Sequence, residues 1–578
     1  MKPNKYILQL LVAVILLPLS VTAQKSEDIF RAAGSPHNPE VQIAFNQYYT
    51  AEGLAALGKK IATAHPELVK RSSIGKSTEG RDIWMLAITN YKVGNADRKP
   101  GFYIDGNIHS NEIQGGEISI YTAWYLTENF GDNAYITEML NDRIFYIVPT
   151  INPDARNNYM KEANTGSSPR AGMIALDDDR DGLFDEDGLE DLDGDGSVTQ
   201  MRRKNPNGNM IVDPKDPRMM IEIGPDDIVT AQRYEYLGSE GVDNDGDGRV
   251  NEDRPGYYDP NRDWAWKWQP DYVQRGAYKY PFSAPETRAV ADFVLSRPNI
   301  AGAQSYHNSG GMILRGPGAE EDISTYNRAD IAIYDAIGKK GEKMMPGYRY
   351  LTVYKDLYSV FGGELDWFYG CRGIYTFTNE IFSSFAYYKT ENRDRNQMYS
   401  FEKDLLMGDA FTEWKSYDHP TYGEIEIGGF RKNIGRATPG FMLEEELHRN
   451  MAFTFYHAFH MPNLSIDQVK EEKLGGGLTQ VTAYIKNDRL IPTHASQDLK
   501  YKITRPDYIS IKGANVVAGM IVTDEDFGVT KEQKNNPNKI AVANIPGNSV
   551  VKVRWIIKGN SKYSIEVDSE KGGLVSSN

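Results

Sequence analysis

The chain has 578 residues, of which 40% are hydrophobic and one is a cysteine, and its formal net charge is −15. This length is sufficient for two or three domains, each with its own hydrophobic core. The excess negative charge lies in two short segments, because residues 177–195 carry a net charge of −10 and residues 240–253 carry −5. The rest of the chain is balanced, so we expect no electrostatic attraction to nucleic acids or anionic membranes.

The first segment, residues 1–23, has the organisation of a secretory signal peptide. Two lysines precede an uncharged run from Tyr6 to Ala23, which ends in small residues. We predict cleavage after Ala23 and a secreted or periplasmic mature protein. The alternative is an uncleaved membrane anchor, but the apolar part is short for a span and Pro18 interrupts it. No later stretch approaches membrane-spanning length, so no stable membrane insertion is expected.

The lone cysteine, Cys371, cannot form a disulfide within the chain. An exported protein without disulfides has to rely on core packing and on bound ions for its stability. We interpret Cys371 as a small buried residue rather than a catalytic thiol.

The region after the signal peptide alternates between helical and strand patterns. Apolar spacing predicts a helix near residues 51–66 and a β-hairpin of strands 71–75 and 81–89. A short strand at 102–106 then leads into a helix over 114–130. His109 and Glu112 therefore fall at a strand-to-helix junction, where open α/β sheets place their ligand sites.

The same criteria predict a buried strand at 143–151, a helix at 285–295 that begins at a proline, and a strand at 300–306 that leads to His307. We therefore expect an α/β domain over residues 24–460, with a mixed central sheet flanked by helices and an acidic insertion at about residues 160–255.

From about residue 461 the pattern changes to short β-type runs separated by turn residues. These runs are residues 481–486, 499–503, 515–522, 540–545 and 550–557. We predict a separate, sandwich-like all-β domain over residues 461–578. Adhesion, support of the first domain and plain structural packing all remain open as its role.

Three residues have the types that a catalytic zinc site requires. Such a site uses three nitrogen or carboxylate ligands and leaves one position for water, which the metal acidifies. His109, Glu112 and His307 satisfy that number, and the chain has only nine histidines. Each of the three alone is weak support, because single histidines are common in proteins without any metal.

The chain resembles the zinc carboxypeptidases of the pancreatic carboxypeptidase type, peptidase family M14, over roughly residues 70–400. Seven motifs in the same order carry the resemblance: Gly75-Lys-Ser-Thr-Glu-Gly80-Arg81, His109-x-x-Glu112, Asn152-Pro-Asp154, Arg203-Lys-Asn, Asp259-Pro-Asn261-Arg262, Ser305-Tyr-His307, and Tyr358-x-x-x-Gly362-Gly363 leading to Glu380. The resemblance implies a carboxypeptidase-like fold and a hydrolase that removes the C-terminal residue of a peptide with a free carboxylate.

The resemblance also implies catalytic roles for residues outside the zinc ligands. Glu380 would act as the general base on the attacking water and would later protonate the leaving amine. Arg203 would polarise the scissile carbonyl and hold the developing oxyanion. Arg202 competes for this role, and the Arg-Lys-Asn context favours Arg203.

Substrate binding is implied for four further residues. Asn261 and Arg262 would bind the free carboxylate, for which a planar guanidinium is suited. Tyr358 would close over that carboxylate, and Asp259 would orient His109. Leu365 stands at the position of the base of the side-chain pocket, and an apolar residue there favours apolar or aromatic C-terminal residues.

The chain departs from the family pattern in two places. His109 and His307 are 198 residues apart because the acidic insertion separates Asn152 from Asn261, and Ala155 follows Asn-Pro-Asp where glycine is usual. The insertion could narrow the cleft and change which substrates reach the metal.

Three loops in the insertion place carboxylates on alternate residues before a turn glycine, the pattern by which a loop surrounds calcium. Their candidate calcium ligands are Asp177, Asp179, Asp181 and Asp185 in the first loop, Asp191, Asp193 and Asp195 in the second, and Asp243, Asp245 and Asp247 in the third. A complete EF-hand has Glu at its twelfth position, where these loops have Gly188, Arg202 and Arg254. We predict shorter calcium loops resembling those of dockerin or thrombospondin type 3 repeats. The alternative is a solvated acidic segment without an ion.

Two other functions are compatible with these residues. One is hydrolysis of cell-wall or γ-linked peptides, or deacylation of a small amide, with the same metal and base. The other is an inactive relative that serves as a binding module, although the presence of all three ligands and Glu380 argues against it. A serine hydrolase is excluded, because Gly75-Lys-Ser77-Thr-Glu-Gly80 has one residue too many for a nucleophile elbow.

Overall fold

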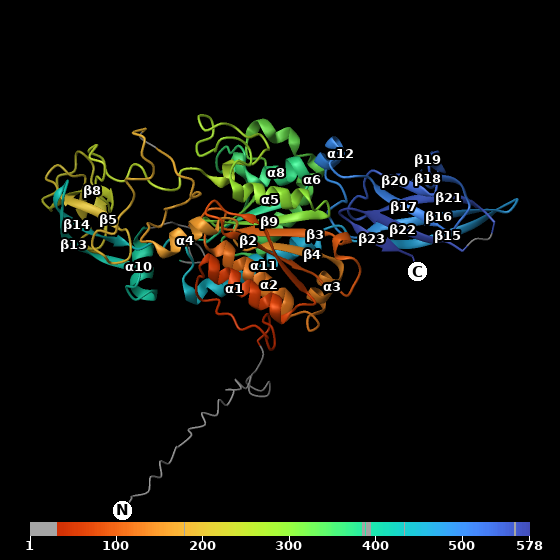
Figure 1. Cartoon of the computed structure of the whole chain (residues 1–578), viewed down its shortest axis with the longest axis horizontal. Coiled ribbons are helices and arrows are strands. Elements are labelled where there is room, and N and C mark those ends of the chain that lie inside the picture. The colour runs from red at the N-terminus through yellow and green to blue at the C-terminus, as the bar shows by residue number, and fades with distance from the viewer. Residues whose placement is uncertain are drawn as a thin grey trace, which may run out of the picture.

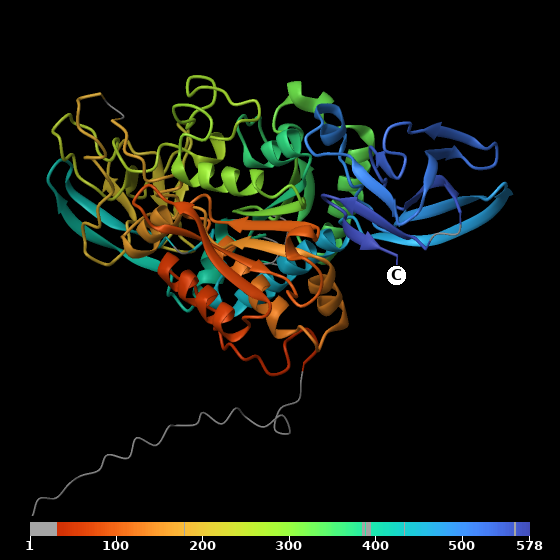
Figure 2. The ribbon, with the colours of Figure 1, turned by 45° about the vertical axis from the view of Figure 1, so that its right-hand side comes forward.

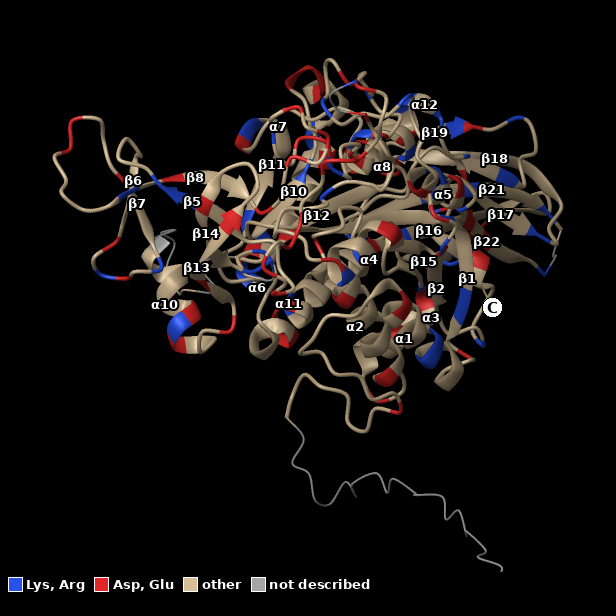
Figure 3. Cartoon of the chain, turned by 60° about the vertical axis from the view of Figure 1, so that its left-hand side comes forward, with Lys and Arg blue, Asp and Glu red and all other residues tan. Residues whose placement is uncertain are grey.

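The computed structural model describes residues 32–177, 180–383, 388, 395–432, 434–559 and 562–577. The predicted signal peptide, residues 1–23, and the predicted calcium ligand Asp179 lie outside the described residues. Among the described helices, none combines the length and the apolar composition needed to cross a membrane. Basic and acidic positions intermingle over most of the described chain (Figure 3).

A mixed sheet forms the centre of the molecule. In spatial order its strands are β1 (Val69–Lys76), β2 (Asp82–Ile88), β4 (Ile144–Val148), β3 (Gly101–Gly106), β9 (Ile300–Asn308), β12 (Tyr375–Ile381), β10 (Met312–Arg315) and β11 (Arg349–Thr352). The four central strands, β4, β3, β9 and β12, are parallel to one another. The pairs β1–β2, β2–β4 and β10–β12 are antiparallel, and β11 is parallel to β10. Every residue of β3, β4 and β9 is buried, as expected for parallel strands covered on both faces.

Helices cover both faces of this sheet (Figure 1). The described α-helices are α1 (Ala51–Ala64), α2 (Gln114–Glu128), α3 (Ala134–Asp142), α4 (Pro153–Lys161), α5 (Pro285–Leu295), α6 (Arg328–Met344), α7 (Val353–Asp356), α8 (Glu364–Arg372), α10 (Arg395–Leu405), α11 (Gly440–Phe459) and α12 (Ser496–Tyr501). One core cluster joins α1, α2 and α11 to the sheet, and a second joins α5 and α8 to it. The predicted α/β fold with flanking helices is therefore confirmed.

The acidic insertion takes part in a second sheet at one end of the molecule (Figures 1 and 2). Its strand order is β13 (Phe411–His419), β14 (Gly423–Phe430), β5 (Gln200–Lys204), β8 (Arg233–Ser239), β6 (Met210–Val212) and β7 (Met220–Glu222). The insertion contributes β5 to β8, and β13 and β14 come from the chain after Glu380. This pairing was not predicted from the sequence, because strands more than 180 residues apart in the chain leave no local signal of their pairing.

Two sheets lie at the opposite end and form the C-terminal β-region (Figure 2). One contains β15 (Leu464–Gly475), β16 (Leu478–Asn487), β21 (Ser549–Lys558), β18 (Val516–Asp524) and β19 (Val529–Glu532), and the other contains β20 (Lys539–Val542), β17 (Asp507–Lys512), β22 (Ser564–Ser569) and β23 (Gly573–Ser576). Their facing apolar residues, including Trp555, Ile509 and Val567, form one core cluster. The predicted all-β character of this region is confirmed.

One predicted strand of that region is wrong. Residues 499–503 were expected to be β, but Leu499 lies in α12 and its amide donates to the carbonyl of Ala495. The carboxylate of Asp498 in this helix accepts hydrogen bonds from Lys571 Nζ and Thr504 N, both at 2.8 Å. These tertiary contacts override the local β-propensity. Lys571 also donates to the Gly373 carbonyl at 2.9 Å, so the β-region is joined to the α/β domain by buried hydrogen bonds.

Candidate metal centre and active site

Three neighbouring strands of the central sheet end at the same place. His109 and Glu112 follow β3, His307 lies near the end of β9, and Glu380 lies near the end of β12. Because β9 and β12 are parallel and in register, Glu380 stands directly opposite His307. Residues far apart in sequence thus meet at the carboxyl edge of the sheet, where open α/β folds place their ligand sites.

His109, Glu112 and His307 form a compact group of potential metal ligands. The Nδ1 atom of His109 lies 3.0 Å from Glu112 Oε1, and the Nδ1 atom of His307 lies 2.9 Å from Glu112 Oε2. The two Nδ1 atoms are 3.3 Å apart, and all three side chains are at most 2% exposed. Two imidazole nitrogens and a carboxylate facing one another fit the donor set of a catalytic zinc ion.

Asp259 fixes the orientation of the His109 ring. Its Oδ1 atom lies 2.8 Å from His109 Nε2. A proton held on Nε2 leaves the lone pair of Nδ1 free for a metal. Burial raises the pKa of the Asp259 carboxyl, but its interactions with the His109 ring and with Arg262 outweigh burial and hold this pKa well below its usual range. Asp259 is therefore ionised, as an acceptor for His109 has to be.

Glu380 faces the same group from β12. Burial, with repulsion from the Glu112 carboxylate, raises the pKa of Glu380 to about 7. The pKa of Glu112 is shifted in the opposite direction. Its interactions with His109, Arg170 and His307 outweigh the effect of burial and hold this pKa well below the usual range. One carboxylate stays ionised as a ligand, and the other can exchange a proton near neutral pH.

A cavity opens from this group of residues. Seven of the residues predicted for the site line it: His109, His307, Asn261, Arg262, Tyr358, Leu365 and Glu380. Arg262 is 8% exposed and Leu365 is 9% exposed, whereas Tyr358 is 57% exposed. The structure therefore brings the predicted carboxylate-binding residues together with the candidate zinc ligands, and Tyr358 lies at the open side.

A tight turn holds the two halves of the carboxylate-binding region together. Gly362 has φ +62°, and a Cβ atom there would lie 2.6 Å from the Arg262 carbonyl oxygen. The Gly362 carbonyl accepts from Trp264 N at 3.0 Å, and Asn261 Oδ1 accepts from Glu364 N at 2.8 Å. Only glycine fits this position, since it combines a left-handed backbone with close contact.

Arg203 does not lie in the cavity beside Glu380, where its predicted role requires it. It belongs to β5 of the peripheral sheet, its guanidinium is paired with Glu235, and it is not among the residues that line the cavity. Arg202, the competing assignment, pairs with Glu426 in the same sheet. The Arg-Lys-Asn context was misleading because the insertion carries this motif away from the centre of the molecule.

Arg170 lies in the cavity instead. Its Nη1 atom donates to Glu112 Oε1, and its positive charge acts on Glu380. Its carbonyl accepts from Ser110 N at 3.0 Å, so the segment is bound to the ligand loop. The sequence offered one signal for Arg170: it is an arginine between Asn152-Pro-Asp154 and Asn261-Arg262, a condition that Arg203 also meets.

Two further residues of the site were also missed. Arg436 lies 3.6 Å from Glu112 Oε1 and donates to the Asn308 carbonyl at 2.8 Å. Asp366 lines the cavity beside Leu365, and burial, with repulsion from Asp322, raises its pKa to about 7. The wall near Leu365 is therefore less apolar than Leu365 alone suggests.

The three acidic loops have a common backbone geometry. In each loop the first aspartate accepts from the glycine amide five residues later: Gly182 to Asp177 at 3.1 Å, Gly196 to Asp191 at 2.8 Å and Gly248 to Asp243 at 3.0 Å. The carboxylates of the second loop lie within 4.8 Å of one another, and so do those of the third: Asp191, Asp193 and Asp195, and Asp243, Asp245 and Asp247. In the first loop, Asp185 instead accepts from Leu176 N at 3.3 Å.

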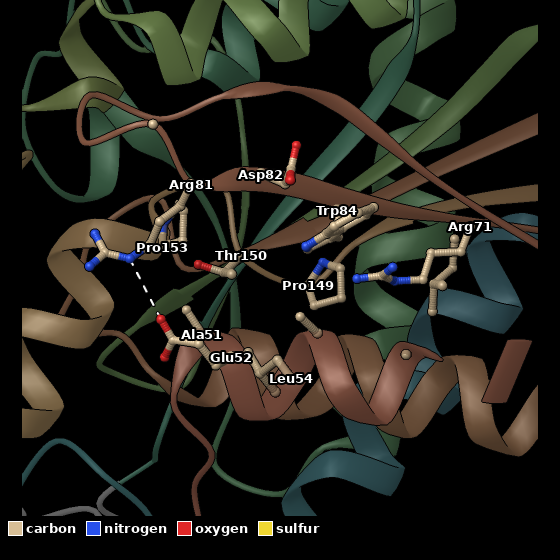
Figure 4. A pocket seen from close by; sticks show the side chains of 14 residues that line it. Ala51, Glu52, Leu54, Arg71, Arg81, Asp82, Trp84, Pro149, Thr150 and Pro153 are labelled. Atoms are coloured by element: carbon tan, nitrogen blue, oxygen red, sulfur yellow. Dashed lines mark ion pairs between the residues drawn. The ribbon is translucent and has the colours of Figure 1, made fainter. Parts of the chain in front are cut away.

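A larger cavity of about 240 Å³ lies elsewhere, between α1 and the β1–β2 hairpin (Figure 4). Arg71 stacks on Trp84 along its wall, and Arg81 forms an ion pair with Glu52. Asp82, the other acidic residue of the lining, is paired with Lys76. The charged side chains of this lining thus already have partners within the protein, and the cavity near Glu380 is the better candidate for chemistry.

Comparison with known proteins agrees with this geometry. A family profile described as zinc carboxypeptidase, peptidase family M14, matches residues 54–175 and 229–392, on both sides of the insertion. The chain contains a zinc carboxypeptidase family domain. The predicted resemblance to this family is therefore confirmed, although the Arg203-Lys-Asn motif lies outside the matched residues. A second profile, described as a domain of unknown function, matches residues 463–578.

Individual zinc carboxypeptidases are similar over short segments. Carboxypeptidase D of Drosophila melanogaster is 30% identical over 119 residues, which is 21% of this chain and 8% of that protein. Carboxypeptidase M of Mus musculus is 29% identical over 116 residues, 20% of this chain and 26% of that protein. The matched part thus spans a small share of these relatives. Among solved structures, carboxypeptidase A from Helicoverpa armigera aligns with a TM-score of 0.41 and 15% identity, covering 72% of this chain and 75% of the other.

Proposed function

We propose that the protein is an active zinc metallocarboxypeptidase that hydrolyses the C-terminal peptide bond of peptides. The observation that carries this proposal is the meeting of His109, Glu112 and His307 beside Glu380, in a cavity that also holds Arg262 and Asn261. Bound zinc would supply Lewis acidity to the scissile carbonyl and would make the attacking water more acidic.

The remaining steps belong to side chains of this chain. Glu380 accepts a proton from the attacking water, and later donates it to the nitrogen of the leaving amino acid. Arg170 stabilises the negative charge that develops on the carbonyl oxygen, because its guanidinium is fixed beside Glu112 before the reaction begins.

Substrate selection depends on the opposite wall of the cavity. Arg262 and Asn261 bind the terminal carboxylate, and Tyr358 closes over it from the exposed side. Leu365 favours an apolar or aromatic C-terminal side chain. Asp366 beside it accepts hydrogen bonds from Gly318 N and Tyr326 Oη, so part of its hydrogen-bonding capacity is already used within the protein.

A series of N-blocked dipeptides tests this function. We expect the zinc-loaded protein to release C-terminal Phe or Leu faster than Lys, to leave the corresponding C-terminal amides uncut, and to lose activity reversibly with a zinc chelator. If only γ-linked or cell-wall peptides are hydrolysed, the protein is a cell-wall or γ-linked peptide hydrolase. Binding of peptides without hydrolysis would support an inactive binding module.

Replacing Arg262 should mainly weaken substrate binding. Removal of one partner of a buried charge pair costs a few kcal/mol, so we expect Arg262→Ala to raise KM on the order of 100-fold with a smaller change in kcat. Steady-state kinetics on a blocked dipeptide measures both constants. The variant should also discriminate less between free acids and amides. An unchanged KM would show that Arg262 does not hold the carboxylate.

The pH profile should show an acidic limb that belongs to Glu380. A general base works in its ionised form, so activity falls as the pH falls through its pKa. Burial and the Glu112 carboxylate raise this pKa to about 7, and a divalent cation nearby favours the ionised carboxylate and lowers the pKa. We therefore expect log kcat/KM to decline below a pH midpoint under 7. A midpoint above 7 would contradict Glu380 as the base.

We further propose that the mature protein is secreted or periplasmic and that the acidic loops bind calcium. The composition of residues 1–23 supports export, and the clustered carboxylates of the second loop support calcium. Retention of Met1 in the purified native protein would contradict cleavage of a signal peptide. Absence of calcium binding in a direct titration would contradict the proposal that the acidic loops bind calcium.

A further inference from the structure

Carboxylates from separate parts of the insertion meet between the first and third acidic loops. Two groups, each with ligand oxygens within 4.8 Å of one another, share Asp245: Asp181 with Glu186 and Asp245, and Asp187 with Glu252 and Asp245. Glu186, Asp187 and Glu252 do not belong to the alternating motifs of the sequence. The loops are therefore brought together by residues that flank them.

Asp253 gives an independent indication of a bound cation. Its side chain is 1% exposed, and among the described residues no N–H or hydroxyl group donates a hydrogen bond to either of its carboxylate oxygens. It lies against Glu186, and both oxygens of Glu186 and of Glu252 are likewise shielded from solvent without a described hydrogen-bond donor. Buried carboxylates without donors are strongly unfavourable unless a positive charge compensates them.

Among the described residues, the surroundings supply neutral donors but no ion pair to these carboxylates. Asp187 accepts from Asn244 Nδ2 at 3.0 Å and from Asn251 N at 3.1 Å, and its own amide donates to the Asp253 carbonyl at 3.0 Å. Within the described part of the chain, no Lys or Arg forms an ion pair with Glu186, Asp187, Asp245, Glu252 or Asp253. The backbone is thus held in place, while the carboxylates repel one another.

We propose that Asp181, Glu186, Asp187, Asp245 and Glu252, together with the adjoining Asp253, bind calcium as one core shared by the first and third loops. The donors are oxygens only, which suits a hard cation, whereas the zinc site has two imidazole nitrogens. Calcium accepts six to eight oxygens in flexible geometry, and magnesium demands a small octahedron with several waters. Many carboxylates on separate segments therefore favour calcium.

The core lies at the base of two segments that reach the zinc site. Asp259, which orients His109, follows Asp253 by six residues. On the other segment, Gly172 N donates to the Tyr258 carbonyl at 2.9 Å, and Arg254 Nη1 donates to Ser168 Oγ at 3.4 Å. Arg170 lies between Ser168 and Gly172. Calcium at the core would thus fix the segments that carry Arg170 and Asp259. This last effect rests on the proposed function, but calcium binding does not.

Calcium and magnesium titrations of the full-length mature, zinc-loaded protein test the site. We expect calcium to raise the Tm by several degrees and magnesium at equal concentration to have a much smaller effect. Asp253→Asn and Glu252→Gln should each lower calcium affinity at this site at least tenfold, measured by calorimetry, and should reduce the shift in Tm. The exposed Asp226→Asn, in the same insertion, should behave as the unchanged protein.

The calcium-free state gives the sharpest comparison. If repulsion between buried carboxylates is relieved by the ion, Asp253→Asn should have the same or a higher Tm than the unchanged protein without calcium, and a lower Tm with it. Equal destabilisation of Asp253→Asn in both conditions, no calcium-induced shift, or an equal shift with magnesium would overturn the proposal. These readouts do not use peptidase activity, so failure of the proposed enzyme function would leave them interpretable.

Discussion

Replacing Glu380 by glutamine is expected to lower kcat/KM about 10³- to 10⁴-fold, the upper part of the range for loss of general acid–base catalysis. Glutamine has nearly the same shape but cannot accept the proton of the attacking water. The amide leaves His109, Glu112 and His307 in place, so zinc content should stay the same. Assays on a blocked dipeptide together with elemental analysis measure both quantities.

The control for this variant is Glu413→Gln, an exposed position on β13 of the peripheral sheet. It removes one carboxylate of the same type, and we expect its kcat/KM to match that of the unchanged protein. Full activity of Glu380→Gln would show that another group takes the proton, and loss of zinc together with activity would assign Glu380 a role in metal binding instead.

The second large effect separates two arginines. Arg170→Ala should lower kcat/KM about 10²- to 10³-fold, the usual result of removing one stabiliser of an oxyanion. Arg203→Ala should change it less than about twofold, because Arg203 is paired with Glu235 on a partly exposed strand, and such pairs contribute little. Steady-state kinetics of both variants at saturating zinc provides the comparison.

Arg170→Lys serves as the conservative variant, since it keeps a positive charge near Glu112 but loses the planar guanidinium. We expect it to recover part of the activity lost in Arg170→Ala. A large loss of kcat/KM in Arg203→Ala, with an unchanged kcat/KM in Arg170→Ala, would indicate that Arg203 stabilises the oxyanion. The peripheral sheet would then have to move over the cavity.

Local patterns were sufficient for much of the site. His109 and Glu112 were placed at a strand-to-helix junction by hydrophobic spacing, and α2 begins two residues after Glu112. The helix at 285–295 was predicted with its observed bounds because a proline begins it and apolar spacing continues through it. His307 was predicted from the strand that leads to it, and the order of the motifs associated it with His109 and Glu112.

Long-range pairing explains what the sequence did not predict. Arg170 and Arg203 both precede Asn261, and only the three-dimensional path of the insertion separates them. The backbone amide of Asp187 donates to the carbonyl of Asp253, 66 residues later, and no periodicity of the sequence predicts this hydrogen bond. The pairing of β14 with β5 similarly depends on the folded α/β domain between them. Such contacts are fixed by packing of distant segments rather than by local propensity.

An anomalous scattering map at the zinc absorption edge, from crystals of the zinc-loaded protein, tests most directly whether His109, Glu112 and His307 bind zinc. We expect one strong peak bounded by His109 Nδ1, His307 Nδ1 and the Glu112 carboxylate, with the Glu380 carboxylate facing it. A strong zinc peak elsewhere, or no peak among these three side chains at saturating zinc, would contradict this expectation.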